Sequence, residues 1–293
     1  MSFDNIMRVD DCTWRLEPKF DSLQPLEALF NALREGSRRD LLFRGQRDAS
    51  WPIHSTFARS DETQRQIRTT EGVKQAYERF YFDQLARVVP SEELERSGSE
   101  DKVYELHRHM QQHPEDYDED CRRTGTLLID WSRCFKVALA FACDRPSSDG
   151  LSAESVLYAV DPQKLVPSSW EKPLIEGYRR LHEHGARGLG VPALFVHPKR
   201  QLTYPRVHRQ DPVYVLQCDI TKPLDQAFLS MASEGPSAKG DSAGPLQRIM
   251  IPDTLKTRVR SLLAAEGITI DWLLESDTAN ASGTATEQTP PSG

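Results

Sequence analysis

Arg44 is the first residue of this sequence whose position suggests chemistry. It follows an apolar run, residues 41–43, and is followed by Gly45 and Gln46. An arginine beside a buried strand is costly unless an anion or a buried polar network receives its charge. A glycine next to it lets a ligand approach the backbone. The pattern therefore indicates an anion clamp at the end of a strand.

A second candidate stretch is DWS, which is Asp130, Trp131 and Ser132. We expect it to interrupt an apolar strand over 126–129 and to precede a small-residue-rich helix over 133–143, with Ser132 as the N-cap. Free backbone N–H groups at such a helix start suit phosphate or ribose hydroxyls. The alternative is that Arg44 and Asp130 form a structural ion pair and that Ser132 only caps the helix, and the residues leave both open.

A third group of residues, His107, His109 and His113, has a spacing that could ligate a metal ion. His109 and His113 share a helical face, but no third ligand is evident near them, so we predict no metal site. The glycines of residues 185–190 (GARGLG) are in the wrong order for a dinucleotide-binding loop, and we expect a flexible loop there.

The composition is that of a globular protein, with 38% hydrophobic and 28% charged residues. The net charge of -7 would repel nucleic acid, although a local basic groove stays possible. No apolar run is long enough to span a membrane, and the N-terminal residues lack a signal-peptide pattern, so we expect a cytoplasmic protein. The five scattered cysteines indicate reduced, mostly buried thiols.

The periodicity of apolar residues predicts the elements that position these groups. Expected helices cover residues 26–33, 71–88, 102–112, 133–143 and 251–267. Expected strands cover residues 41–45, 126–129, 155–160, 193–196, 213–218 and 248–251. Ser22 and Gly36 would cap and stop the first helix, and Gly267 would end the last.

These elements predict an α+β fold in a single domain, with a central mixed or antiparallel sheet flanked by helices. We expect an N-terminal extension over 1–20 and one domain over 21–276. Within the domain, residues 232–245 should form a loop insertion, and the Ser/Thr/Pro-rich residues 277–293 should be disordered.

The chain also resembles the FRG domain family, named for the Phe-Arg-Gly that stands here at residues 43–45. Similar blocks follow at RGQ with Trp51 and Arg59, at Glu71, at Gln112-His113, and at TLLIDWSRCFKVALAFA over 126–142. Later blocks include Arg206, Gln210, Tyr214 and a closing helix, so the resemblance spans roughly 25–275. Leu127 and Pro212 depart from the arginine and the glycine that are usual in the family.

The resemblance implies an arrangement like that of ADP-ribosyltransferases, with NAD as the substrate and no metal. It implies that Arg44, Ser132 and Gln210 are catalytic. It implies that Arg44, Gly45, Gln46, Asp130, Trp131 and Ser132 bind NAD, with Arg44 on the pyrophosphate or a ribose, and Asp130 and Ser132 at the nicotinamide-side ribose. Trp131 would stack on an aromatic ring or belong to the core.

This chemistry needs a rigid grip on the dinucleotide and a carboxylate or acceptor near the ribose, on which positive charge develops. Gln210 can accept a hydrogen bond but carries no charge, so the reaction would use Asp211 or another acid. The resemblance implies an enzyme that modifies a protein or nucleic acid, or hydrolyses NAD, as in toxins and phage defence, with a possible antitoxin partner and no membrane. The alternative is a non-catalytic FRG module that binds a partner protein or a nucleotide.

Overall fold

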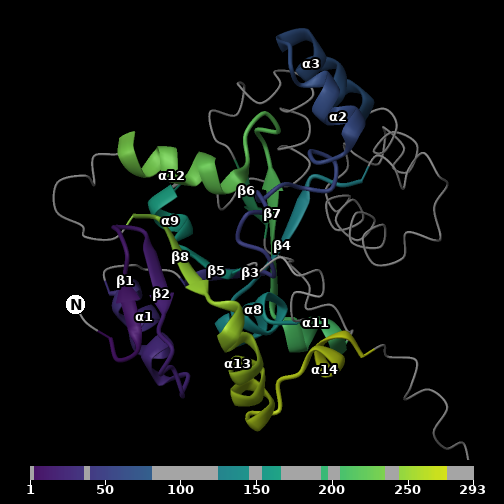
Figure 1. Ribbon diagram of the computed structural model, residues 1–293. Coiled ribbons are helices and arrows are strands. Elements are labelled where there is room, and N and C mark those ends of the chain that lie inside the picture. The colour runs from purple at the N-terminus through teal and green to yellow at the C-terminus, as the bar shows by residue number, and fades with distance from the viewer. Residues whose placement is uncertain are drawn as a thin grey trace, which may run out of the picture.

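The protein folds as an α+β structure around one mixed sheet, as seen in a computed structural model (Figure 1). The structure describes residues 3–35, 40–80, 125–144, 154–165, 193–196, 205–234 and 244–275. The strands are β1 (Ile6–Arg8), β2 (Thr13–Leu16), β3 (Leu42–Gln46), β4 (Leu128–Ser132), β5 (Ser155–Val160), β6 (Ala193–Val196), β7 (Pro212–Gln217) and β8 (Leu246–Ile251).

The order of the strands is β1-β2-β8-β5-β3-β4-β7-β6. Strands β2 and β8 pair in parallel, and the other neighbouring pairs are antiparallel. The sheet is therefore mixed, as the sequence predicted.

The pairing between β3 and β4 is short, and this divides the sheet. Phe43 pairs with Ser132, and no further pair of residues joins these two strands. By contrast, β3 pairs with β5 along its whole length, and β4 does so with β7. The sheet thus consists of two well-paired halves that separate just beyond Phe43.

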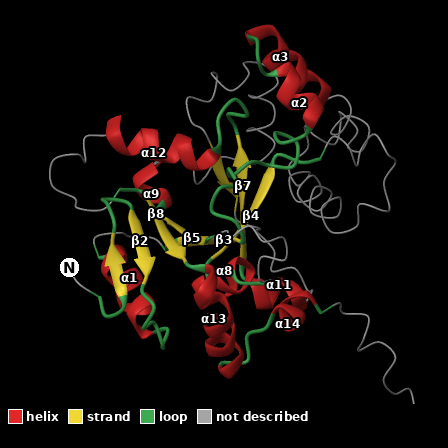
Figure 2. Ribbon diagram, in the orientation of Figure 1, coloured by secondary structure: helices red, strands yellow, loops and turns green. Residues whose placement is uncertain are grey.

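Helices cover both faces of the sheet (Figure 2). They are α1 (Gln24–Arg34), α2 (Asp61–Gln66), α3 (Thr70–Arg79), α8 (Phe135–Ala142), α9 (Pro162–Leu165), α11 (Pro205–Gln210), α12 (Leu224–Glu234), α13 (Asp253–Ala265) and α14 (Ile270–Leu274). Among these described helices, none is long and apolar enough to cross a bilayer.

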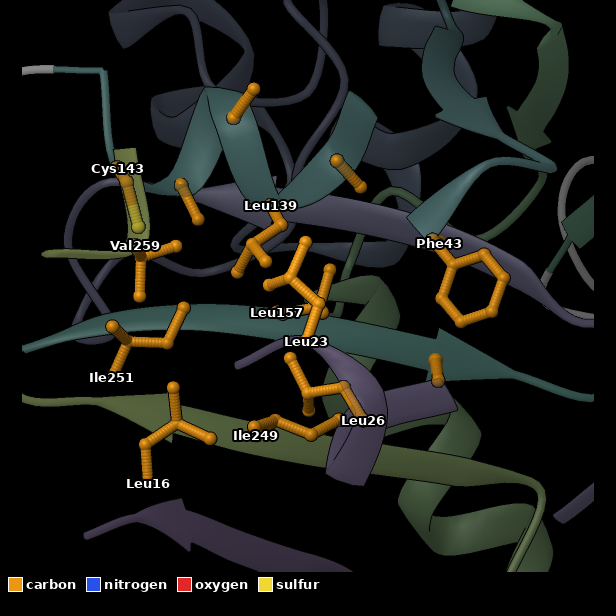
Figure 3. Packing of buried hydrophobic residues seen from close by; sticks show 14 of the residues in the cluster. Leu16, Leu23, Leu26, Phe43, Leu139, Cys143, Leu157, Ile249, Ile251 and Val259 are labelled. Carbon is orange, nitrogen blue, oxygen red and sulfur yellow. The ribbon is translucent and has the colours of Figure 1, made fainter. Parts of the chain in front are cut away.

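The larger core lies between one face of the sheet and helices α1, α8 and α13. Figure 3 shows Phe43, Leu157 and Ile249 of the sheet among Leu139 of α8 and Leu26 of α1. A second apolar cluster lies on the other face. It contains residues from each of the strands β3 through β8, together with Leu224 and Phe228 of α12. Every residue of β5 and β7 is buried, and burial of a face specifies the register of a strand.

Most of the predicted elements are confirmed. The helices predicted over 26–33 and 251–267 correspond to α1 and α13, and the strand predicted over 41–45 corresponds to β3. The remaining predicted strands correspond to β4, β5, β6, β7 and β8, with shifts of at most a few residues. Helix α3 forms the described part of the helix predicted over 71–88.

The prediction that DWS interrupts its strand is wrong. Residues 130–132 belong to β4, because they continue the ladder with β7 opposite Tyr214, Val213 and Pro212. The predicted helix starts later, at Phe135, and its N-cap is Cys134 and not Ser132. The first helix is likewise capped by Leu23 instead of Ser22, without a side-chain hydrogen bond, and a proline stands in its first turn.

Several elements escaped the prediction. Strands β1 and β2 lie in the stretch predicted as an N-terminal extension, and helices α2, α9, α11, α12 and α14 were not expected. Helix α12 also includes residues 232–234 of the expected loop insertion. The histidines at 107, 109 and 113, the expected helix over 102–112, and the loop over 185–190 lie outside the described residues.

Gly45 allows α8 to pack directly against β3. A Cβ atom at this position would lie 1.8 Å from the carbonyl oxygen of Ala138 and 2.7 Å from the backbone nitrogen of Ala142. Both are main-chain atoms, so no side chain can move aside. The small residues of α8 and the glycine of β3 together set the helix-to-strand distance.

We predict that Gly45→Ala lowers the free energy of unfolding by about 3 kcal/mol, because α8 or β3 must shift to relieve the overlap. Denaturant titration would measure it. Gly267→Ala is the comparison, since this glycine has φ +79° but open space around it, and its cost should be about 1 kcal/mol from backbone conformation alone. An equal loss of unfolding free energy in the two variants would contradict the claim that Gly45 is needed for the packing of α8 against β3.

Candidate functional site

A cavity of about 730 Å³ opens where β3 and β4 separate. Its volume lies within the range of small-molecule and cofactor sites. All of the residues predicted for the site line it: Arg44, Gly45, Gln46, Asp130, Trp131, Ser132 and Gln210. The chain brings them together from β3, β4 and the end of α11, which lie far apart in the sequence.

Arg44 spans the opening between the two strands. Its Nη1 donates a hydrogen bond of 2.5 Å to the backbone carbonyl oxygen of Asp130. The sequence left open an ion pair between Arg44 and Asp130. The structure instead joins the Arg44 guanidinium to the main chain of Asp130, while the Asp130 carboxylate acts at longer range and raises the pKa of Arg44. Burial outweighs this effect and lowers that pKa from its ordinary value.

A second arginine faces the same space. Arg59 is exposed, lines the cavity and lowers the pKa of Arg44 by charge repulsion. Within the described part of the chain, its guanidinium makes no hydrogen bond or ion pair. Two like charges held at one cavity repel each other until an anion binds between them. The pair is therefore suited to a phosphate or pyrophosphate group.

Three buried polar atoms at the cavity have no partner among the described residues: Nε of Arg44, Oε1 of Gln46 and Nε1 of Trp131. Trp131 and Gln46 are only 3% and 8% exposed, so bulk water does not readily satisfy them. An unsatisfied buried polar group costs roughly 1–3 kcal/mol. All three atoms belong to residues that line the cavity, so a small shift of these side chains would let the two donors and the acceptor reach a polar ligand.

Ser132 and Gln210 are joined to each other and to the surrounding backbone. The hydroxyl of Ser132 donates to the carbonyl oxygen of Gln210 at 2.6 Å and accepts from the N–H of Cys134 at 3.0 Å. The side-chain amide of Gln210 donates to the carbonyl oxygen of Leu273 in α14 at 2.9 Å. Both side chains thus hold the cavity wall together.

Two carboxylates line the cavity, Asp130 and Asp144, and no glutamate does so among the described residues. Asp211, the acid considered from the sequence, is not part of the lining. Its carboxylate accepts a 2.8 Å hydrogen bond from Arg133, and its backbone has φ +40°. Of the acids considered, Asp130 lines the cavity beside the predicted site residues Trp131 and Ser132, and it is exposed.

The sequence predicted that Gly45 lets a ligand approach the backbone. The structure shows another reason for a glycine there, because the backbone of α8 occupies the space that a side chain would need. No metal-ligating group of three or more His, Cys, Asp or Glu side chains occurs in the described ranges.

Sequence reasoning gave no role to five further lining residues: Arg47, Trp51, His54, Arg59 and Asp144. Trp51 and Arg59 belong to the blocks that carry the family resemblance, which was a usable signal. The others follow β3 or the end of α8, and nothing in their spacing revealed that the turn after β3 folds back over the cavity.

The first prediction for the site concerns Arg44. Since burial penalises its charge, Arg44→Met should leave the free energy of unfolding within about 1 kcal/mol of wild type in the absence of ligand. Chemical denaturation would measure it. A loss of 3 kcal/mol or more would show that Arg44 is a structural residue, as the ion-pair reading holds.

The second prediction concerns His54, whose ring bonds to Gln217 at 3.2 Å. Burial lowers its pKa from the ordinary value of 6.5, although Asp225 and Gln217 raise it. The unfolded chain thus binds the proton more readily, and stability should fall as the pH drops below about 6.5. His54→Gln should flatten this part of the pH profile of unfolding. An unchanged profile would contradict the assignment.

No curated protein and no solved structure matches the chain. The family match ends before Gln210 and α13, so it covers only the earlier blocks of the resemblance. Residues 39–150, which contain β3, β4 and α8 with Arg44, Asp130 and Ser132, match the FRG domain family.

Proposed function

We propose that the protein is an NAD-binding enzyme of the ADP-ribosyltransferase type, which transfers ADP-ribose to a protein or nucleic acid or hydrolyses NAD. The observation that supports this most is the gathering of Arg44, Arg59 and Asp130 on one cavity with unsatisfied buried polar atoms. The arginines would hold the pyrophosphate and Asp130 would face the ribose that becomes positive.

The step itself breaks the bond between ribose C1′ and the nicotinamide nitrogen. The electron pair of that bond leaves with nicotinamide, which becomes neutral. Water or an acceptor group then bonds to C1′ and loses a proton. Asp130 would stabilise the positive ribose electrostatically, while Ser132 and Gln210 keep the wall of the site rigid. Gln46 and Trp131 would supply an acceptor and a donor to polar groups of the substrate.

A second function has its own support. Gln210 already donates to Leu273, and no glutamate is found among the described lining residues. These two observations favour an FRG module that binds a nucleotide or a partner protein through Arg44 and Arg59 without cleaving NAD.

Release of nicotinamide from NAD by the purified protein would test the proposal. We expect release by wild type and a loss of about 100-fold in rate for Arg44→Met and for Asp130→Asn. Arg133→Gln serves as a control, because Arg133 is bonded to Asp211 and does not line the cavity.

The outcomes separate the two functions. Partner binding that depends on Arg44, together with a melting temperature that NAD does not change and no release of nicotinamide, would favour the binding module. Release that is unaffected by both Arg44→Met and Asp130→Asn would place the reaction elsewhere.

A further inference from the structure

A solvent-exposed tryptophan lies at the rim of the cavity. Trp51 is 47% exposed, although large aromatic side chains contribute most to stability when buried. It lines the same cavity as Arg44. One side of its ring is occupied by the guanidinium of Arg47, whose Cζ lies 5.7 Å from the ring centroid.

The backbone fixes the position of Trp51. The carboxylate of Asp48 accepts hydrogen bonds from the N–H of Ser50 at 2.8 Å and from its hydroxyl at 2.6 Å, while the N–H of Trp51 donates to the carbonyl oxygen of Asp48. The N–H of Ala49 donates to the carbonyl oxygen of Glu154 at 2.7 Å. The exposure of Trp51 is therefore built into a tight turn.

Two side chains of helix α13 donate hydrogen bonds to the backbone of residues at the same rim. The ammonium group of Lys256, which is only 2% exposed, donates to the carbonyl oxygen of Arg47 at 3.2 Å. Arg260 donates to the carbonyl oxygen of Asp144 at 3.2 Å. The carboxylate of Asp144 in turn lies 4.0 Å from Nη1 of Arg47. The buried charge of Lys256 is also paired with Asp253 at 3.1 Å, and its bond to Arg47 fixes the backbone of the residue that stacks on Trp51.

We propose that this rim, consisting of Arg47, Trp51 and Asp144, binds the adenine base of the dinucleotide by stacking on the indole ring of Trp51. The inference rests on the proposed function, because it names which end of the substrate the rim takes. A flat base gains stacking energy on an exposed aromatic ring without needing specific hydrogen bonds.

The other end of the dinucleotide would lie at the opening between β3 and β4. The group that reacts needs the carboxylate of Asp130, which lines this opening together with Gln46 and Trp131. The adenine base takes no part in bond cleavage and can remain at an exposed rim. The arginines at 44 and 59 would then hold the pyrophosphate between the two ends.

Two probes separate the ends of the substrate. Adenosine diphosphate carries the base and the pyrophosphate, and nicotinamide mononucleotide carries the nicotinamide end without adenine. Dissociation constants for both would be measured by calorimetry on wild type, Trp51→Ala and Trp51→Phe. We expect Trp51→Ala to weaken adenosine diphosphate about tenfold and to leave nicotinamide mononucleotide within twofold, while Trp51→Phe retains most of the affinity.

Trp272→Ala is the matched control. Trp272 is also exposed, at 39%, and Cζ of Arg209 lies 5.6 Å from its ring centroid, but it does not line the cavity. This variant should change neither affinity. Melting temperatures near that of wild type would verify that all three variants are folded.

Each other result decides the question. The inference would be overturned if Trp51→Ala left adenosine diphosphate binding unchanged or weakened both probes equally. Loss of nicotinamide mononucleotide binding alone in this variant would also overturn it. Failure of wild type to bind adenosine diphosphate would overturn it too. If adenosine diphosphate binding depends on Trp51 but no NAD is cleaved, the rim stands and the proposed enzymatic function fails.

Discussion

The separation of β3 from β4 is the constraint on which the rest of the site depends. Their ladder stops at the pair Phe43 and Ser132, although each strand is fully paired on its other side. The side chain of Arg44 then bridges the gap to the carbonyl oxygen of Asp130. Stabilisation of each half by its own partners lets the protein keep an opening in the middle of its sheet, where polar groups of two strands can face a ligand.

The electrostatics of the cavity differ from those of the whole chain. The protein has a net charge of -7, whereas the cavity is lined by three arginines and two aspartates. Burial lowers the pKa of Arg44 more than the neighbouring Asp130 raises it, and Arg59 lowers it further, so its charge is held where the fold alone gains little from it. Such an arrangement favours the binding of an anion over the stability of the free protein.

The sequence revealed the strands that are buried on both faces and missed features that depend on distant contacts. The apolar runs at 155–160 and 213–218 coincide with β5 and β7, since such strands read as continuous hydrophobic segments. DWS was misread because alternation of polar and apolar residues in β4 resembled an interruption. Strands β1 and β2 are short and partly exposed, so their pattern was weak.

The same division holds for the site. Arg44, Asp130 and Ser132 were predictable because an arginine after a strand and a DWS before a helix are local signals. The hydrogen bond of Ser132 to Gln210, which is 78 residues away, replaced the expected helix cap. Trp51 and Asp144 reach the cavity through a turn and a helix end that only the folded chain brings together.

A crystal structure of the protein with ADP-ribose would test the central claim most directly. We expect electron density for the pyrophosphate between β3 and β4, with its oxygens within hydrogen-bond distance of the guanidinium groups of Arg44 and Arg59. Ligand density at any other place on the protein, with the guanidinium of Arg44 still bonded only to Asp130, would contradict it.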